Sequence, residues 1–317
     1  MISSLAPLLQ RQKCLVLDGG LATELEKRGA QLNDHLWSAR LLIEEPTWIQ
    51  AVHYDYLLAG ADIITTASYQ ASFEGLARVG LSLDRATALF QKSVQLAQEA
   101  RTDFEALSLP NRLRPLIAAS IGPYGAYLAD GSEYRGNYGL SMEELKAFHR
   151  ARLHLLANSE VDLLAIETIP SALEAQALLE LLEEQRTAYA FLSFSCRDAQ
   201  SISDGHAFSE MVRRFSGHPQ LLAIGLNCTA PQHILPLLQG AAPFSRIPLL
   251  VYPNSGEGWD AERKCWLAGR EEGQWELGPQ AWYRAGARIM GGCCRVGPEK
   301  IRQIRKEMHS EWSWASL

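Results

Sequence analysis

Two adjacent cysteines near the C-terminal end of the chain, Cys293 and Cys294, follow two glycines and precede an arginine. They come directly after an apolar run that is typical of a buried strand. A third cysteine, Cys228, ends another buried apolar run 65 residues earlier. Three thiolates select zinc or another thiophilic metal ion. Because three protein ligands leave the fourth tetrahedral position open, the set predicts a catalytic rather than a structural metal site.

A regular strand could not present both neighbouring cysteines to one ion, because adjacent side chains point to opposite faces. The strand must therefore end before Cys293, and Gly291 and Gly292 are expected to supply the backbone freedom for that break. The alternative is that these cysteines are buried apolar side chains, which are common in protein cores. That alternative is the expectation for the other three cysteines, Cys14, Cys196 and Cys265.

The elements that would position the cysteines are eight short apolar runs separated by amphipathic segments of helical length. Continuous apolarity is typical of strands covered on both faces, as in a parallel sheet. The runs comprise residues 14–17, 62–65, 116–119, 163–166, 189–192, 221–227, 248–251 and 287–290.

Eight strand–helix alternations predict an α/β protein, a (β/α)8 TIM barrel that forms a single domain over residues 1–317. A doubly wound open sheet is the alternative, because its parallel strands look the same in sequence. Two features favour the barrel. The number of predicted strands is eight, and residues capable of chemistry lie at the C-terminal ends of many of these strands, whereas an open sheet would gather them at one crevice. In a closed barrel the sixth and eighth strands end on the same rim, which would bring Cys228 to Cys293 and Cys294.

Composition and charge restrict the class of protein. The net charge of −6 and the lack of a dense Lys/Arg block argue against a nucleic-acid partner. No apolar run approaches the ~18 residues of a membrane span, and the apolar region at the start is too short for a secretory signal. Six cysteines are too few for a disulfide framework in a chain of 317 residues. A reduced, cytoplasmic protein is expected.

Other chemistries of α/β proteins lack their signatures here. No histidine falls at the end of a predicted strand, so a hydrolase with a metal site rich in histidine and carboxylate is disfavoured. No G-x-G-x-x-G run is present, so a dinucleotide site lacks its fingerprint.

Several motifs resemble those of the homocysteine S-methyltransferases, which include betaine–homocysteine methyltransferase and the homocysteine module of cobalamin-dependent methionine synthase. The matching features are DGG after the first strand, a glutamate after the fourth, GLNC at the end of the sixth, and GGCCR after the eighth. The resemblance covers nearly the whole chain, in order. The stretches DGGLATELEKRG, ITTASYQAS, IGPYGAYLADGSEYRG and VYPNSGE are most similar to the branch that uses S-methylmethionine or S-adenosylmethionine.

The resemblance implies a zinc-dependent transferase of methionine biosynthesis that acts on small molecules. Cys228, Cys293 and Cys294 would hold Zn²⁺, and the thiol of L-homocysteine would take the open position. Attack of that thiolate on a sulfonium methyl donor, in an SN2 displacement, would give methionine. The resemblance further implies that four residues hold the amino-acid end of homocysteine: Asp18, Gly19, Thr66 and Glu167.

The sequence leaves several alternatives open. Selenocysteine or another thiol could replace homocysteine, and S-methylmethionine is not ranked against S-adenosylmethionine. A thiol–metal sensor without turnover is the non-enzymatic alternative. Residues 124–138, a long segment rich in glycine and tyrosine, could cover the donor, since a loop of that length in a compact domain is usually functional. The oligomeric state does not follow from the sequence.

Overall fold

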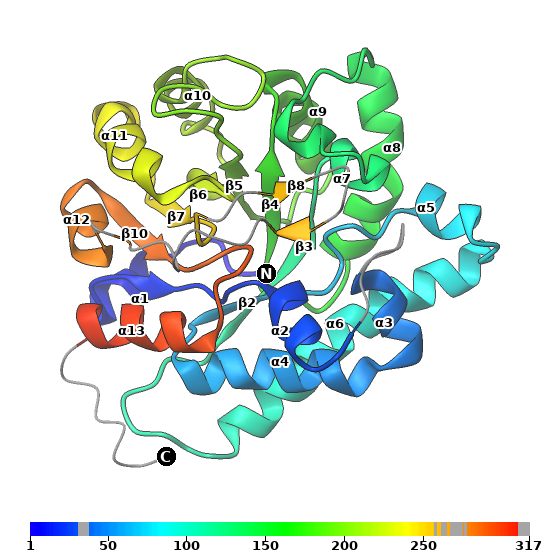
Figure 1. Ribbon diagram of the computed structural model, residues 1–317, viewed down its shortest axis with the longest axis horizontal. Helices are drawn as coiled ribbons and strands as arrows, with labels where there is room; N and C mark the ends of the chain where they lie inside the picture. The colour runs from blue at the N-terminus through cyan, green and yellow to red at the C-terminus, as the bar shows by residue number, and fades with distance from the viewer. Residues whose placement is uncertain (31–37, 257–258, 261–264, 267–274, 276–277, 310–317) are drawn as a thin grey trace.

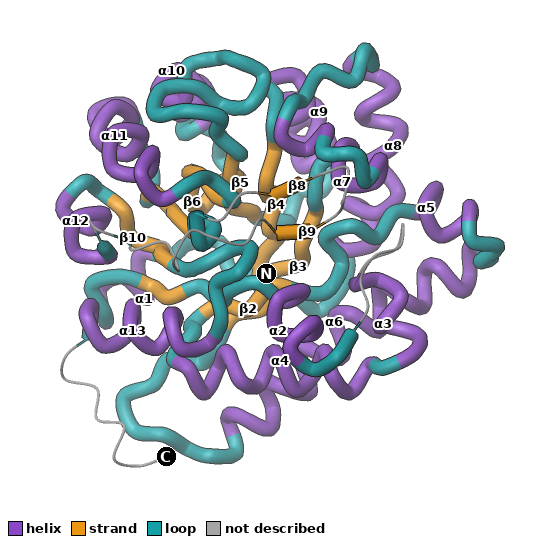
Figure 2. Tube along the Cα trace, viewed as in Figure 1, coloured by secondary structure: helices purple, strands orange, loops and turns teal. Residues whose placement is uncertain are grey.

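The computed structural model describes residues 1–30, 38–256, 259–260, 265–266, 275 and 278–309. Within these residues, eight parallel strands gather at the centre of the molecule, and helices surround them (Figure 1; Figure 2). The strands are β1 (Leu15–Val16), β2 (Ile63–Thr65), β3 (Leu116–Ile121), β4 (Leu163–Ile169), β5 (Ala190–Phe194), β6 (Leu221–Asn227), β7 (Leu249–Tyr252) and β10 (Ala287–Met290). A separate antiparallel pair consists of β8 (Trp259–Asp260) and β9 (Cys265–Trp266).

Helices follow the strands along the chain, as the predicted alternation requires. The α-helices are α1 (Ala6–Arg11), α2 (Leu21–Lys27), α3 (Ser38–Glu44), α4 (Pro46–Ala59), α5 (Phe73–Arg78), α6 (Leu83–Glu105), α7 (Tyr124–Leu128), α8 (Met142–Ala157), α9 (Ala172–Glu183), α10 (Phe208–Phe215), α11 (Pro231–Ala241), α12 (Pro279–Arg284) and α13 (Pro298–Met308). Two short 3₁₀ helices are η1 (Ser132–Tyr134) and η2 (Ala242–Phe244). None of the described helices is both long and apolar enough to cross a bilayer.

The sheet closes on itself. Its strand order is β1-β10-β7-β6-β5-β4-β3-β2, and a parallel bridge between Leu17 and Ile63 joins the first strand to the second. The amide of Asp18 donates to the carbonyl oxygen of Ile63 across the same junction, at 3.0 Å. This closure confirms the predicted (β/α)8 barrel and excludes the doubly wound open sheet.

Successive strand residues alternate between two apolar clusters, which explains why the strands are apolar throughout. Leu17, Phe191 and Ile289 belong to the cluster that fills the barrel interior. Their neighbours in sequence, such as Val16 and Leu192, belong to the larger cluster between the strands and the helices. Each strand is therefore buried on both faces, as a parallel barrel requires.

Local sequence signals set the helix boundaries. Proline occupies the first turn of α4 and α13, where its missing N–H has no intrahelical partner to lose. Ser141 and Glu144 form a capping box at the start of α8, because each side chain bonds to the backbone N–H of the other. The helices between successive strands bring the chain back to the start of the next strand, so that every strand ends on the same rim.

Candidate active site

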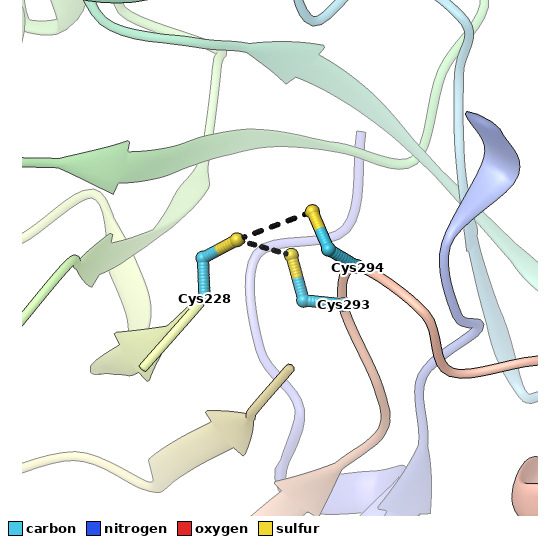
Figure 3. A group of neighbouring side chains, drawn as sticks. All are labelled: Cys228, Cys293 and Cys294. Atoms are coloured by element: carbon cyan, nitrogen blue, oxygen red, sulfur yellow. Dashed lines mark hydrogen bonds between the residues drawn. The ribbon is translucent and has the colours of Figure 1, made fainter. Parts of the chain in front are cut away.

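Three cysteine side chains converge where β6 and β10 end (Figure 3). The Sγ atom of Cys228 lies 3.1 Å from that of Cys293 and 3.4 Å from that of Cys294. All three sulfur atoms lie within 4.8 Å of one another, a spacing that allows them to bind a single ion. A set of three soft thiolates fits Zn²⁺ and leaves one tetrahedral position for a substrate atom. The predicted convergence of Cys228 with the two neighbouring cysteines is confirmed.

The strand does end before the cysteine pair, as their adjacency requires, because β10 stops at Met290. The expected reason for the two glycines is wrong. Neither Gly291 nor Gly292 has a φ in the left-handed region. Instead, a Cβ atom on Gly292 would lie 2.0 Å from Cγ1 of Val296, and one on Gly291 would lie 2.7 Å from the carbonyl oxygen of Leu17. Close packing, rather than backbone freedom, selects glycine at both positions.

Left-handed backbone occurs instead at the third ligand. Cys228 has φ +48°, a conformation that non-glycine residues adopt rarely and that is common at functional sites. Its amide donates to the carbonyl oxygen of Tyr252 at 3.2 Å, and the amide of Cys293 donates to that of Pro253 at 2.8 Å. Both ligand segments are thus bonded to the end of β7, which lies between them in the sheet.

Polar side chains surround the sulfur atoms. Nδ2 of Asn227 donates to Sγ of Cys293 at 3.8 Å and to the hydroxyl of Thr168 at 2.8 Å. The hydroxyl of Tyr134 lies 3.3 Å from Sγ of Cys228. Hydrogen bonds from the thiols of Cys293 and Cys294 hold the pKa of Cys228 well below its usual value, since they stabilise its thiolate. Contacts that stabilise a thiolate suit a site for a thiophilic cation.

The four residues expected to hold the amino-acid end of homocysteine line the same pocket as the cysteines. They are Asp18, Gly19, Thr66 and Glu167. No Lys or Arg appears among the described residues that line this pocket. A lining of carboxylates and thiols without a cationic side chain suits positively charged ligands.

Asp18 and Glu167 are both buried, and both bond to the ends of other strands. The carboxylate of Asp18 accepts hydrogen bonds from the amide and the hydroxyl of Thr65, at 2.7 and 3.1 Å. Glu167 accepts from the hydroxyls of Ser120 and Tyr252. Burial raises the pKa of Asp18 well above its usual value and the pKa of Glu167 to about 7. A bound ammonium would reverse this desolvation effect, because it favours the charged form of each carboxyl.

Thr65 and Thr66 both line the pocket, although neighbouring strand residues normally point to opposite faces. The hydroxyl of Thr66 accepts from the amide of Ser120 at 3.0 Å and lies 2.7 Å from the hydroxyl of Ser68. These bonds tie the end of β2 to the end of β3. A direct contact between Thr66 and substrate stays a prediction.

Four residues beyond the predicted set take part in the site: Glu133, Tyr134, Asn227 and Tyr252. The sequence pointed to the loop that carries Glu133 and Tyr134, since residues 124–138 were expected to be functional.

Two other tyrosines of that loop pack away from the pocket. Tyr124 packs edge-on against Tyr138 and Phe148, with ring centroids 5.2 and 4.9 Å apart. Neither Tyr124 nor Tyr138 lines the pocket. Asn227 ends β6 and Tyr252 ends β7. Both fall in stretches that carried the family resemblance, GLNC and VYPNSGE, but neither side chain was singled out there.

Known proteins share both the sequence and the fold. A family model described as homocysteine S-methyltransferase matches residues 15–308. Homocysteine S-methyltransferase YbgG of Bacillus subtilis is 48% identical over 299 residues, which cover 94% of this chain and 95% of that protein. Selenocysteine Se-methyltransferase of Brassica oleracea var. italica is 44% identical over 310 residues, covering 94% of this chain and 90% of that protein.

A solved structure supports the same assignment. The metallated form of the homocysteine methyltransferase MmuM from Escherichia coli matches with a TM-score of 0.85 at 44% identity, covering 96% of this chain and 99% of that one. The motifs that suggested the family lie at the ends of the barrel strands, where the three cysteines and the two buried carboxylates meet. The chain belongs to the homocysteine S-methyltransferase family and is a methyltransferase enzyme.

Proposed function

We propose that this enzyme transfers a methyl group from S-methylmethionine or S-adenosylmethionine to the thiol of L-homocysteine, and that it depends on zinc. The observation that carries the proposal is the convergence of the three cysteine sulfur atoms in a pocket that also presents Asp18 and Glu167. Cys228, Cys293 and Cys294 would hold the ion. Bound zinc would keep the homocysteine sulfur deprotonated at neutral pH, where a free thiol with a pKa of ~8.5 is mostly protonated.

The side chains of the pocket bind and orient the substrate. Asp18 and Glu167 pair with the ammonium of homocysteine, and the backbone at Gly19 and the side chain of Thr66 contact its amino-acid end. Holding the homocysteine sulfur and the methyl group in line can lower the activation barrier by up to ~7–11 kcal/mol in well-oriented systems. The homocysteine sulfur forms a bond to the methyl carbon, and the electron pair of the broken bond returns to the donor sulfur. Both sulfur atoms end as neutral thioethers.

The chemistry needs no general base from the protein. Accordingly, no histidine appears among the described residues that line the pocket. His53 and His149 are buried in helices α4 and α8 instead. The pocket is therefore compatible with methyl transfer to a metal-bound thiolate, which requires no histidine.

The test combines metal analysis with a donor panel. Purified enzyme should contain about one zinc per chain and should form methionine from homocysteine with at least one of the two sulfonium donors. Cys294→Ser should lose both zinc and activity, whereas the control Cys196→Ala, altered at a buried cysteine outside the cluster, should keep both. Full activity in a metal-free preparation would refute zinc dependence.

The acceptor is tested in the same assay. One relative is named selenocysteine Se-methyltransferase, so selenocysteine is the specific rival to homocysteine. Competition between the two acceptors at equal concentration gives the ratio of their kcat/KM values. The proposal expects methionine to be the main product.

A further inference from the structure

Glu133 is a pocket carboxylate that the proposed chemistry has not used. It lies in η1, on the loop after β3, and lines the same pocket as the three cysteines. Its Oε2 atom is buried and has no hydrogen-bond partner among the described residues. Burying a carboxylate oxygen without a partner is unfavourable, so such a group in a pocket points to a ligand.

The backbone, rather than the carboxylate, fixes the position of Glu133. The carbonyl oxygen of Glu133 accepts a hydrogen bond from the hydroxyl of Ser195 at 3.0 Å. A Cβ atom on Gly125 would lie 2.3 Å from the amide nitrogen of Glu133, so α7 packs directly against this residue. The neighbouring Arg135 bonds to Ser132 and lies 3.7 Å from Asp130. Contacts with Ser195 and α7 thus hold the segment that carries Glu133, and its side chain lines the pocket.

Glu133 lies on the metal side of the pocket. The hydroxyl of the next residue, Tyr134, is 3.3 Å from Sγ of Cys228. The nearby Cys228 is one of the causes that raise the pKa of Glu133. Burial is the larger cause for Glu133, whose pKa rises to about 7. A nearby cation would restore the charged form of this carboxylate.

The kind of cation follows from the surroundings of each carboxylate. An ammonium donates hydrogen bonds, and Asp18 and Glu167 are acceptors whose carboxylates are held in place by donors at the strand ends. A sulfonium has no N–H or O–H, so it is recognised by negative charge and by aromatic rings. Near Glu133 the pocket offers a carboxylate oxygen without a described donor and the side chains of Tyr69 and Tyr134.

We propose that Glu133 forms the subsite for the sulfonium centre of the methyl donor, an inference that rests on the proposed function. The positive charge on the donor sulfur disappears as the methyl group moves to the homocysteine sulfur. The carboxylate therefore stabilises the bound donor more than the transition state. Glu133 contributes to donor affinity and contributes little to the rate of the bound complex.

Glu133→Gln tests this assignment in the zinc-loaded enzyme. The KM for S-methylmethionine should rise about tenfold, whereas kcat should not fall. The KM for homocysteine and the zinc content should stay at the wild-type values. The control Glu143→Gln removes the same charge from an exposed position on α8 and should change none of these quantities.

A binding comparison isolates the sulfonium from the rest of the donor. The compound 2-amino-5-methylhexanoate has a carbon atom in place of the sulfur of S-methylmethionine and carries the same ammonium and carboxylate. Calorimetric titration of Glu133→Gln should show about tenfold weaker binding of S-methylmethionine and unchanged binding of the carbon analogue. Glu133→Asp keeps the charge and should retain most of the preference for the sulfonium.

Three results would overturn the assignment. An equal loss of affinity for both compounds would make Glu133 a partner of the donor ammonium, and no loss for either would remove it from the donor site. Zinc content well below one per chain in Glu133→Gln would make it a metal ligand. Failure of the proposed function shows separately, since wild-type enzyme would then form no methionine from either sulfonium donor.

Discussion

The hydroxyl of Tyr252, at the end of β7, donates a hydrogen bond of 3.0 Å to Oε2 of Glu167, at the end of β4. The same hydroxyl lies 2.5 Å from Oγ of Ser193, at the end of β5. Three strand ends are therefore linked through one phenol group. Because this bond favours the charged form of Glu167, it opposes the effect of burial on the pKa of that carboxyl.

Tyr252→Phe should make binding of homocysteine more sensitive to acid. Glu167 has a pKa of about 7, and only its ionised form attracts an ammonium. Wild-type kcat/KM for homocysteine should thus fall as the pH drops below about 7. Loss of the hydrogen bond should raise the midpoint of this fall by about one pH unit. Tyr189→Phe is the control, because Tyr189 packs against the barrel interior cluster and does not line this pocket. Superimposable pH profiles for Tyr252→Phe and wild type would contradict the role of this bond.

Asn227→Ala should weaken zinc binding without removing a ligand. Its amide nitrogen donates to Sγ of Cys293, a bond that stabilises the thiolate. Loss of such a supporting bond typically lowers metal affinity by about tenfold or more. Competition with a chromophoric chelator measures the change, and Asn158→Ala, at the exposed end of α8, is the comparison. Equal zinc affinity in the two variants would show that the thiolates alone determine binding.

His53→Leu should flatten the acid dependence of stability. Burial lowers the pKa of His53 to about 4, and neither ring nitrogen has a described partner. The unfolded chain binds a proton at this residue near pH 6.5, so the stability that is present above that pH is lost as the pH falls toward 4. A leucine cannot titrate. Urea unfolding at pH 8 and pH 5 should therefore show a smaller loss in His53→Leu than in wild type. His154→Leu, at an exposed site, should behave as wild type.

Two glycine-to-alanine changes should have opposite effects on stability. In β6, a Cβ atom on Gly225 would lie 1.8 Å from the carbonyl oxygen of Leu250, in the paired strand β7. Gly225→Ala should destabilise the protein by about 3 kcal/mol or more, because backbone must move. In α11, a Cβ on Gly240 would meet no atom within 4 Å. Gly240→Ala should be stabilising, by about 0.5–1 kcal/mol, because alanine is the better helix former. Thermal unfolding of the two variants measures both, and a stable Gly225→Ala would contradict the close approach of these strands.

The predicted barrel and the convergence of the cysteines followed from local patterns. Each strand is a continuous apolar run, because both of its faces are buried. Once eight such runs alternate with helices, closure places every strand end on one rim. That rule brought Cys228 to Cys293 and Cys294 across 65 and 66 residues of sequence. The sequence by itself thus determined the fold class and the residues that form the candidate metal site.

Tertiary structure decided which side chains surround that site. Tyr252 and Asn227 act through contacts with residues 85 and 66 positions away, and such contacts depend on strand register that no local pattern encodes. Gly292 is selected by its packing against Val296, whereas sequence suggested backbone freedom. Glu133 reaches the pocket because α7 and Ser195 hold its backbone there. Local apolar periodicity specifies elements, but the path of a loop and the depth of a side chain are set only when distant elements pack.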